Sequence, residues 1–369
     1  MKYSYWEHKE WFTGNDFIIV GSGIVGLTCA INLKKRFPKS NVLVLEKGIL
    51  PQGASTKNAG FACFGSASEL LSDLKNHSKE EVFSLVKKRW EGLLLLRKLL
   101  GDKKIDFQQN YGYEIFINQE KLEESCGGVD ELNQLLFPIF KQNIFSIVQD
   151  RFKFQNCITT QIVNLFEGQI NTGKMVTELL NLAQQRGIKI LNNTMVKSFS
   201  EDSNHVKIQT NQGEFRSSKL CFATNGFSKE LLKENIQPAR AQVLITKPIK
   251  DLHIKGTFHL DEGYYYFRNI HNRILFGGGR NLDFTTEETT QFGQTDLIQE
   301  SLEGLLKTTI LPGIKFEIDH RWSGIMGVGS QKTPIIKQLS NHVFCGVRLG
   351  GMGVAIGSLV GKELAELAN

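Results

Sequence analysis

The sequence lacks the features of membrane-spanning, exported and nucleic-acid-binding proteins. Its longest apolar runs, at residues 17–20 and 93–96, are far shorter than the roughly 20 residues that a membrane helix needs. Residues 1–9 contain no apolar core of a signal peptide. The net charge is only +6, and the lysines and arginines are spread along the chain rather than gathered in a basic run. We therefore expect a cytoplasmic protein with no membrane span and no nucleic-acid partner.

Cysteine is also scarce, and its pattern argues against disulfides and metal sites. The six cysteines lie singly, without a C-x-x-C pair, in a chain of 369 residues that is too long to need a disulfide framework. The eight histidines have no ligand spacing with one another or with cysteine, so we expect no metal. With 41% hydrophobic and 22% charged residues, the composition is that of an ordinary globular protein. At roughly 150 residues per domain, there is room for two domains.

The N-terminal part of the chain predicts a strand, a helix and a second, parallel strand. Residues 16–20 (DFIIV) are apolar and mostly β-branched or aromatic, residues 24–37 have a helical pattern that ends before Pro38, and residues 41–45 (NVLVL) are again apolar. Their combined length of about 30 residues is that of a βαβ unit. Such a unit predicts an α/β fold with a parallel sheet.

The turn between the first strand and the helix reads GSGIVG and matches the pattern G-x-G-x-x-G. Gly21 permits a tight turn, Gly23 lets a pyrophosphate approach the backbone, and Gly26 lets the helix pack closely on the strand. The N–H groups at the start of the helix favour phosphate binding. Glu46 follows the second strand, 20 residues after Gly26, where a carboxylate accepts hydrogen bonds from ribose hydroxyls. The pattern therefore predicts a dinucleotide site, for either NAD or FAD.

The remaining segments alternate between two architectures. Helices are predicted at residues 80–100, 175–186, 294–307 and 354–367, and strands at 113–117, 188–190, 195–198, 205–210, 214–215, 219–223 and 343–346. Four further short strands, at residues 241–247, 257–260, 264–268 and 274–278, predict an antiparallel sheet. Because α/β patterns lie on both sides of that sheet in the chain, we expect two interleaved domains.

Four segments carry a family resemblance. Residues 53–61 (GASTKNAGF) are similar to a loop of pattern GAS-x-R-N-x-G, with Lys57 in place of the usual arginine. The segments SYWE at 4–7, ATNG at 223–226, and 321–367, which contains W-x-G-x-M-G and GGMG, follow in matching order. On these residues, the chain resembles the D-amino-acid oxidase superfamily of FAD-dependent oxidoreductases over nearly its whole length.

Within that superfamily, the nearest patterns are those of glycine and sarcosine oxidases and, more closely, γ-glutamylputrescine oxidase. The segments YYYFR at 264–268 and RILFGG at 273–278, together with Trp322, favour the last group. Met326 stands where glycine oxidases carry an arginine that binds the substrate carboxylate, and Met352 replaces the histidine of the family's G-x-G-H-G. The resemblance therefore implies an amine or amino-acid substrate without favouring a small amino acid.

The resemblance also implies how the two domains are built. We expect an α/β, Rossmann-like FAD-binding domain of residues 1–79, 160–230 and 320–369. Interleaved with it would be an α+β substrate domain, built on the antiparallel sheet, of residues 80–159 and 231–319. The residues implied to bind FAD are Gly21, Ser22, Gly23, Ile24, Val25, Gly26, Glu46, Lys47, Ala54, Ser55, Asn58, Ala59, Gly60, Phe61, Val196, Ala223, Thr224, Gly226, Gly324, Gly350, Gly351, Met352 and Gly353.

The implied reaction is oxidation of a C–N bond in an amine or amino acid. The substrate would give a hydride to flavin N5, the resulting imine would hydrolyse, and oxygen or another acceptor would take the electrons. Cys63 and Cys345 lie in no motif for covalent flavin attachment, so the expected FAD is noncovalent. Since the cofactor performs the difficult chemistry, no catalytic acid or base needs to stand out in the sequence.

One strand supplies the candidates for the substrate site. Its period of two places Tyr264, Tyr266 and Arg268 on one face. If this face points to the flavin, Arg268 pairs with a substrate carboxylate and Tyr266 bounds the pocket. Alternatively, Arg268 is a surface residue and the tyrosines pack the sheet. Arg321 and Arg348 are weaker candidates that we expect to be structural.

Two other functions remain open at this point. One branch of the superfamily modifies a wobble base of tRNA, which the positive net charge favours and the absence of a basic stripe opposes. A dehydrogenase that reduces membrane quinone would need a surface amphipathic anchor. The segment at residues 80–100 is the candidate for such an anchor, although its pattern also fits core packing.

Overall fold

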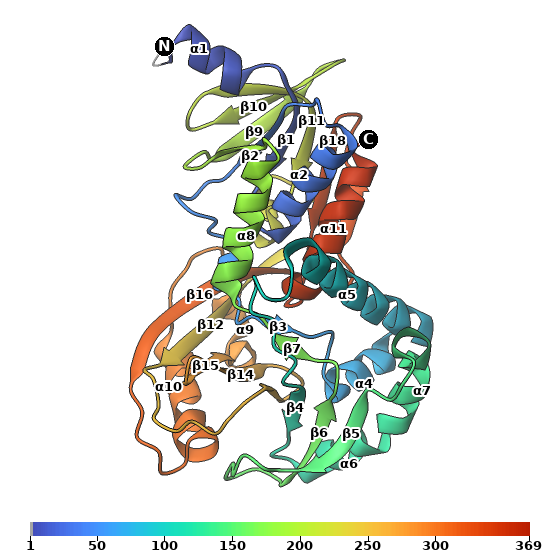
Figure 1. The fold of residues 1–369 in the computed structure, drawn as a ribbon, viewed down its shortest axis with the longest axis vertical. Helices are drawn as coiled ribbons and strands as arrows, with labels where there is room; N and C mark the ends of the chain where they lie inside the picture. The colour runs from blue at the N-terminus through green and yellow to red at the C-terminus, as the bar shows by residue number, and fades with distance from the viewer. Residues whose placement is uncertain (1–2) are drawn as a thin grey trace.

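The computed structural model describes residues 3–369 and contains two large sheets, one above the other in the view of Figure 1. The upper sheet follows the order β17-β18-β11-β1-β2-β8, and the hairpin of β9 and β10 joins it through β11. Its strands are β1 (Asn15–Val20), β2 (Val42–Leu45), β8 (Lys189–Leu191), β9 (Val196–Glu201), β10 (Val206–Thr210), β11 (Glu214–Phe222), β17 (Ile335–Gln338) and β18 (Val343–Val347). The five strands from β18 to β8 run parallel, as the βαβ pattern predicts.

The apolar strands of this sheet are buried on both faces. Ile19 and Val44 pack against the helices α2 (Ile24–Arg36), α8 (Thr172–Gln185) and α11 (Gly353–Leu367). Ile18 and Val20 point to the opposite face and pack against residues of β9, β10 and β11. This burial explains why the strands read as continuous apolar runs rather than as alternating patterns.

The lower sheet follows the order β16-β12-β15-β14-β13-β4-β6-β5. Its strands are β4 (Gly112–Ile115), β5 (Phe145–Gln149), β6 (Thr160–Asn164), β12 (Gln237–Thr246), β13 (Thr257–Leu260), β14 (Tyr265–Ile270), β15 (Arg273–Gly278) and β16 (Ile318–Val328). One face carries an aromatic core that includes Phe258, Phe267 and Phe276, and α10 (Asp296–Leu305) packs on it. The other face is turned toward the upper sheet.

A helical layer stands beside the lower sheet (Figure 1). It consists of α4 (Ala67–Asn76), α5 (Lys79–Leu100), α6 (Gln119–Gly127) and α7 (Val129–Phe140). The remaining short elements are α1 (Tyr5–Glu7), η1 (His8–Phe12), α3 (Ala54–Lys57), β3 (Phe61–Ala62), β7 (Gly168–Gln169), η2 (Asn225–Glu230), η3 (Arg280–Leu282), α9 (Phe284–Glu287) and η4 (Leu306–Ile310).

The predicted helices and strands are found close to their expected positions, but one expectation is wrong. Residues 214–215 and 219–223 do not form separate strands, because Ser217 pairs with both Val206 of β10 and Asn15 of β1, and β11 therefore continues between the two ladders. The four strands predicted to form an antiparallel sheet, now β12, β13, β14 and β15, do pair antiparallel. The sheet also contains β4, which pairs in parallel with β13. The sequence patterns also missed α6 and α7.

The segments that build the two sheets alternate along the chain, as an interleaved architecture requires. The strands β6 and β16 lie in the lower sheet, although the predicted boundaries place residues 160–164 and 320–328 with the FAD-binding domain. The boundaries themselves stay a prediction.

Within residues 3–369, no helix has both the length and the hydropathy of a membrane-spanning segment. The long helix α5 begins after Ser78, whose side chain forms a capping box with Glu81. It buries Val86, Leu93 and Leu96, and its middle packs against α11. Because its apolar side chains are used in the core, α5 does not present the apolar face that an interfacial anchor needs.

Candidate active site

A cavity of about 1260 Å³ runs between the two sheets. It is lined by Val20, Glu46 and Ala223, which follow or end the parallel strands β1, β2 and β11, and by Tyr266 and Val243 of the lower sheet. Pockets for a single small ligand usually measure about 300–1,000 Å³. The volume therefore suits an extended cofactor together with a substrate.

The glycines of the GSGIVG turn allow three close backbone approaches. Gly21 has a φ of +104°, and a Cβ there would lie 2.8 Å from the carbonyl oxygen of Ala223. A Cβ on Gly26 would overlap the carbonyl oxygen of Gly21, and one on Gly23 would lie 2.7 Å from Ser55 Oγ. Gly23 lines the cavity at the start of α2. The turn thus brings the cavity to the N-terminus of that helix, and helix N-termini favour phosphate binding.

Glu46 is a buried carboxylate that is fixed before any ligand arrives. It accepts hydrogen bonds from the N–H of Ser22 (3.0 Å), the hydroxyl of Ser22 (2.8 Å) and the N–H of Gly48 (3.0 Å). It also lines the cavity, whereas Ser22 is fully buried behind it. Ser22 therefore orients Glu46 and does not itself face the ligand space.

The loop at residues 53–61 is rigid because Asn58 bridges both of its ends. The amide nitrogen of Asn58 donates to the carbonyl oxygens of Ala54 (3.1 Å) and Ser55 (2.9 Å). Its amide oxygen accepts from the N–H of Gly60 (2.9 Å) and the hydroxyl of Thr172 (3.0 Å). These bonds hold the small residues of the loop along the cavity wall.

The chain returns to the cavity at the GGMG turn. Gly350 has a φ of +59°, and all four residues of the turn line the cavity where α11 begins, at Gly353. The Sδ of Met352 lies 3.8 Å from the Sγ of Cys63. Burial raises the pKa of the Cys63 thiol well above its ordinary value. A helix N-terminus and a set of backbone N–H groups therefore face this end of the cavity, where they favour negative charge.

Most residues predicted to bind the cofactor line this one cavity. They are Gly23, Ile24, Val25, Glu46, Lys47, Ala54, Ser55, Asn58, Ala59, Gly60, Phe61, Val196, Ala223, Thr224, Gly324, Gly350, Gly351, Met352 and Gly353. Gly21, Ser22, Gly26 and Gly226 instead lie in the surrounding structure. Gly226 has its own close approach, because a Cβ there would clash with the carbonyl group of Met326 on β16.

The two predicted substrate residues are placed differently. Tyr266 lines the cavity, and burial raises the pKa of its hydroxyl to about 12. Arg268 is not a surface residue and is not on the lining either. It is 2% exposed, and its Nη2 lies 3.0 Å from the position of a Cβ on Gly60. Tyr264 and Tyr266 of the predicted strand face line the cavity, whereas the loop at Gly60 lies beside the guanidinium of Arg268. The roles of Tyr266 and Arg268 at the substrate stay a prediction.

The weaker arginine candidates are structural, as expected. Arg348 borders the cavity but donates hydrogen bonds to the carbonyl oxygens of Thr333 (2.9 and 3.1 Å) and Asn235 (3.3 Å). Arg321 donates to Gln299 (2.7 Å) and Glu303 (2.6 Å). Both guanidinium groups are therefore used within the protein.

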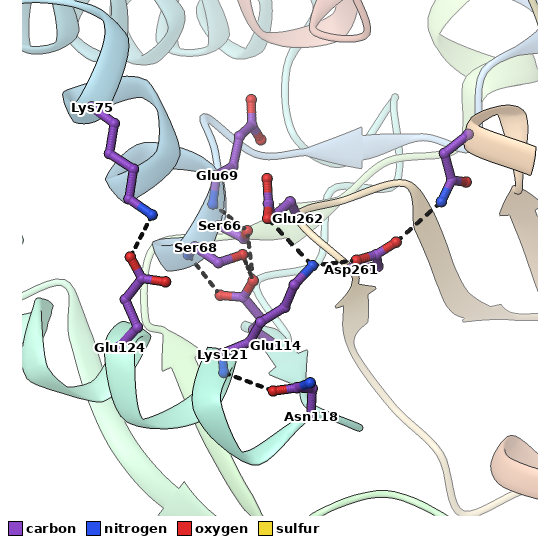
Figure 2. Close-up of polar contacts among 11 residues, drawn as sticks. Ser66, Ser68, Glu69, Lys75, Glu114, Asn118, Lys121, Glu124, Asp261 and Glu262 are labelled. Carbon is purple, nitrogen blue, oxygen red and sulfur yellow. Dashed lines mark hydrogen bonds and ion pairs between the residues drawn. The ribbon is translucent and has the colours of Figure 1, made fainter. Parts of the chain in front are cut away.

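A group of charged side chains, which we call the charged wall, also lines the cavity and was not predicted from the sequence. Its lining members are Glu69, Asp73, Arg89, His259, Glu262, Arg280 and Lys332. Figure 2 shows Glu114 beside this wall, accepting hydrogen bonds from the hydroxyls of Ser66 (3.0 Å) and Ser68. Burial raises the pKa of Glu114, an effect that the bonds from Ser68 partly offset. Apart from Glu69 and Asp73, which both lie in α4, these residues come from different segments of the chain, so no local motif unites them.

Several members of the wall neutralise one another. Lys332 lies 2.6 Å from Asp73 and 3.3 Å from Glu69, and Arg89 lies 3.6 Å from Glu69. Burial opposes the charge on Glu69, but Arg89 and Lys332 together lower its pKa. Arg280 differs from them, because it has no ion pair or side-chain hydrogen bond within residues 3–369 and stacks over Phe284 at 4.7 Å.

An FAD molecule fits the cradle formed by these residues. The fixed carboxylate of Glu46 and the start of α2 at Gly23 both border the cavity, which is the donor and acceptor set that a ribose and a pyrophosphate require. The loop of Ala59 and Gly60 and the GGMG turn then line the part of the cavity that leads to the charged wall. A single cavity thus joins the dinucleotide cradle to the part that the charged wall lines, which we call the polar pocket.

Comparisons with known proteins agree with this arrangement. The model of the DAO family, described as FAD dependent oxidoreductase, matches residues 16–367. The chain is 23% identical over 372 residues to gamma-glutamylputrescine oxidoreductase of Escherichia coli, covering 95% of this chain and 83% of that protein. It is 22% identical over 372 residues to a probable oxidoreductase, OrdL, of Haemophilus influenzae, covering 95% and 82%.

Solved structures show the same fold. L-proline dehydrogenase from P. horikoshii superposes with a TM-score of 0.76 at 20% identity, covering 96% of this chain and 92% of that one. Glycine oxidase from Bacillus cereus gives a TM-score of 0.77 at 16% identity, covering 96% and 94%. Because the family model spans nearly the whole chain, the protein belongs to the DAO family of FAD-dependent oxidoreductases.

Proposed function

We propose that the protein oxidises a C–N bond of an amine or amino acid with noncovalently bound FAD. The observation that carries this proposal is the continuity of the cavity from the dinucleotide cradle to the polar pocket around Tyr266 and His259. Bound in this cradle, FAD would supply a hydride acceptor for the carbon beside the amine nitrogen, and the imine product would hydrolyse in water. Oxygen or another acceptor takes the electrons afterwards.

The protein's own part is to hold and orient the two reactants. The small residues at 58–60 and the GGMG turn leave space for a flat ring system, and the start of α11 favours negative charge beside it. Tyr266 stays a neutral hydroxyl at ordinary pH, since its pKa is raised to about 12. It can therefore bound the pocket and donate a hydrogen bond without adding charge.

Arg280 is the better candidate for binding a substrate carboxylate. It lines the cavity without an ion pair within the described residues, whereas Arg268 is buried behind Gly60. A guanidinium that no protein carboxylate neutralises favours an anionic group of the ligand. This arrangement supports an amino acid, or an amine that carries a carboxylate, as the substrate.

Noncovalent binding is supported by the state of the cysteines. The thiolate is the reactive form of cysteine, and burial keeps the Cys63 thiol protonated. Cys345 lies in β18 and is not part of the cavity lining, and burial raises its pKa to about 11. Neither thiol is therefore suited to attack a flavin.

The test is anaerobic reduction of the purified yellow protein, followed at about 450 nm, where flavins absorb. The panel contains amino acids, N-methyl amino acids and polyamine conjugates. We expect one class to bleach the flavin and an acceptor to restore the colour. Bleaching by dithionite but by no amine would contradict the proposed function while leaving the cofactor assignment intact.

A further inference from the structure

A histidine and a tyrosine stand side by side on the sheet face that borders the cavity. His259 of β13 pairs directly with Tyr266 of β14 and, on its other side, with Glu114 of β4. Directly opposed residues present their side chains on the same face of a sheet. His259 and Tyr266 both line the cavity, and the ring of Phe61 meets them edge-on at 5.3 and 5.6 Å.

His259 is bonded to a buried carboxylate on the side away from the cavity. Its Nε2 lies 2.6 Å from Oε1 of Glu167, whose side chain is fully buried in the segment between β6 and β7. Glu167 has room because residue 112 is glycine, where a Cβ would clash with the carboxylate. The other oxygen of Glu167 has no hydrogen-bond partner within residues 3–369. The hydrogen bond to His259 is thus the main interaction that compensates for the burial of the Glu167 carboxylate.

This contact determines which ring nitrogen is available. With an N–H at Nε2 donating to Glu167, the lone pair of the neutral imidazole is at Nδ1. No hydrogen bond joins Nδ1 to another side chain or backbone group of the described chain. A histidine on the cavity wall, oriented by a carboxylate and with one free nitrogen, is arranged as a proton acceptor.

Several titratable side chains lie near His259. Glu114 of β4 and Tyr266 of β14 are its direct sheet partners, and Glu69 of α4 also acts on its charge. Cys63, in the loop after β3, and Arg89 of α5 line the same cavity. Burial opposes the charged imidazolium, but Glu167, with smaller effects from Glu114 and Glu69, raises the pKa of His259.

Neighbouring groups are poorer proton acceptors. The pKa of Tyr266 is raised to about 12 and that of Cys63 well above its ordinary value, so both are already protonated. Glu69 is held by Arg89 and Lys332.

We propose that His259 accepts a proton from the ammonium group of the bound substrate at Nδ1, with Glu167 as the positioning residue. This inference rests on the proposed function. In the step, one N–H bond of the ammonium breaks, its electron pair stays on the amine nitrogen, and a new N–H bond forms at Nδ1. No electrons are transferred. The neutral amine that results can release a hydride, which an ammonium cannot do readily.

The pH dependence of this step has a definite direction. His259 accepts a proton only when it is neutral, so the rate of flavin reduction rises as the pH passes upward through its pKa. In Glu167→Gln, the main carboxylate that stabilises the imidazolium is removed, and the rise moves to lower pH. In His259→Gln, we expect a loss of about 100-fold near neutral pH, within the usual range for a general base. This loss shrinks as the pH approaches the pKa of the substrate amine.

The experiment measures anaerobic flavin reduction at saturating amine from low to high pH in the FAD-loaded protein. Because His259→Gln leaves Glu167 buried without its partner, the double variant His259→Gln/Glu167→Gln is included as a neutral pair that can keep a hydrogen bond. His253→Gln is the matched control, since this histidine bonds to the carbonyl oxygen of Phe152 and does not line the cavity. A second readout is the ¹⁵N NMR titration of His259, assigned by its loss in His259→Gln and compared between wild type and Glu167→Gln.

The inference is supported if both histidine variants lose the rate, if high pH restores it, and if the rate profile and NMR titration of Glu167→Gln shift together to lower pH. Suppose that an amine reduces the flavin of the wild-type protein. The inference is then overturned if His259→Gln or the double variant shows the same rate and pH profile of flavin reduction as the wild type. A titration of His259 that Glu167→Gln leaves unchanged would also overturn it. A wild-type protein that no amine reduces would instead refute the proposed function, and the proton-transfer role with it.

Discussion

The ring of Tyr266 lies over Gly277, its direct partner on β15. A Cβ at Gly277 would lie 2.7 Å from Cε2 of the tyrosine ring and 2.8 Å from its hydroxyl oxygen. The strand can therefore hold this ring against the cavity wall only because its neighbour has no side chain.

Gly277→Ala should therefore displace Tyr266 and change substrate binding. Overpacking of this kind typically costs about 1–3 kcal/mol. We expect KM for the reducing amine to rise by about three- to tenfold, while the FAD content stays as in wild type because Gly277 is not part of the cradle. Steady-state kinetics and the ratio of flavin to protein absorbance measure both quantities. An unchanged KM would show that the position of Tyr266 does not matter to the substrate.

Gly23→Ala should weaken FAD binding. The added methyl group would lie 2.7 Å from Ser55 Oγ, which accepts a hydrogen bond from the N–H of Ile24 (2.9 Å), so it would disturb that contact at the start of α2. We expect an affinity loss of about tenfold or more, equivalent to at least about 1.4 kcal/mol. The matched control is Gly304→Ala in α10, where no atom lies within 4 Å of the new Cβ and which does not line the cavity. Titration of apoprotein with FAD, followed by flavin fluorescence, distinguishes the two, and equal losses would contradict the prediction.

Loss of charge at Arg280 and at Arg268 should affect KM differently. For a substrate that carries a carboxylate, Arg280→Gln should raise KM by about tenfold or more, since a charge-assisted hydrogen bond contributes about 1.5–3 kcal/mol. Arg268→Met should leave KM unchanged, because Arg268 is outside the cavity lining.

Arg268→Met should also keep or increase thermal stability. The Nε of Arg268 has no hydrogen-bond partner, and burial lowers the pKa of the guanidinium to about 10. Replacing a poorly compensated buried charge by an apolar side chain of similar length is often neutral or stabilising. A raised KM in this variant would instead indicate that Arg268 takes part in substrate binding.

The flavin should be released by denaturation. Acid precipitation of the protein should leave all FAD in the supernatant, because the buried thiol of Cys63 is protonated and Cys345 is outside the lining. Cys63→Ser should behave identically. Flavin that pellets with the wild type but not with Cys63→Ser would refute noncovalent binding.

The buried ion pair of Arg240 and Glu287 should be sensitive to single but not to double replacement. The guanidinium donates two hydrogen bonds, at 2.6 and 2.8 Å, and Glu287 is fully buried. Arg240→Met strands that carboxylate and should lower the free energy of unfolding by about 3–5 kcal/mol, whereas Arg240→Met/Glu287→Leu should be close to wild type. Urea denaturation of the holoprotein measures both, and a double variant as unstable as the single one would contradict this account.

The cofactor cradle could be predicted from the sequence because its chemistry is local. The GSGIVG turn needs glycine for contacts within a few residues, such as that between Gly26 and Gly21, and Glu46 directly follows its strand. These requirements are properties of a short backbone segment, so a short pattern can express them. The alternation of β14 likewise predicted that Tyr264 and Tyr266 share a face, and both line the cavity.

The polar pocket could not be predicted in this way. Glu167 and His259 are 92 residues apart, and Glu69 and Lys332 are 263 residues apart, so no spacing rule connects either pair. Whether Arg268 reaches the cavity likewise depends on a distant segment, because the loop at Gly60 lies beside its guanidinium.

The sequence by itself determined the βαβ unit, the dinucleotide cradle and the family. Only the tertiary structure decided which charges meet, which are neutralised and which arginine faces the cavity. The physical reason is that backbone conformation follows from neighbouring residues. The ionisation and accessibility of a buried group instead depend on side chains that arrive from elsewhere in the chain.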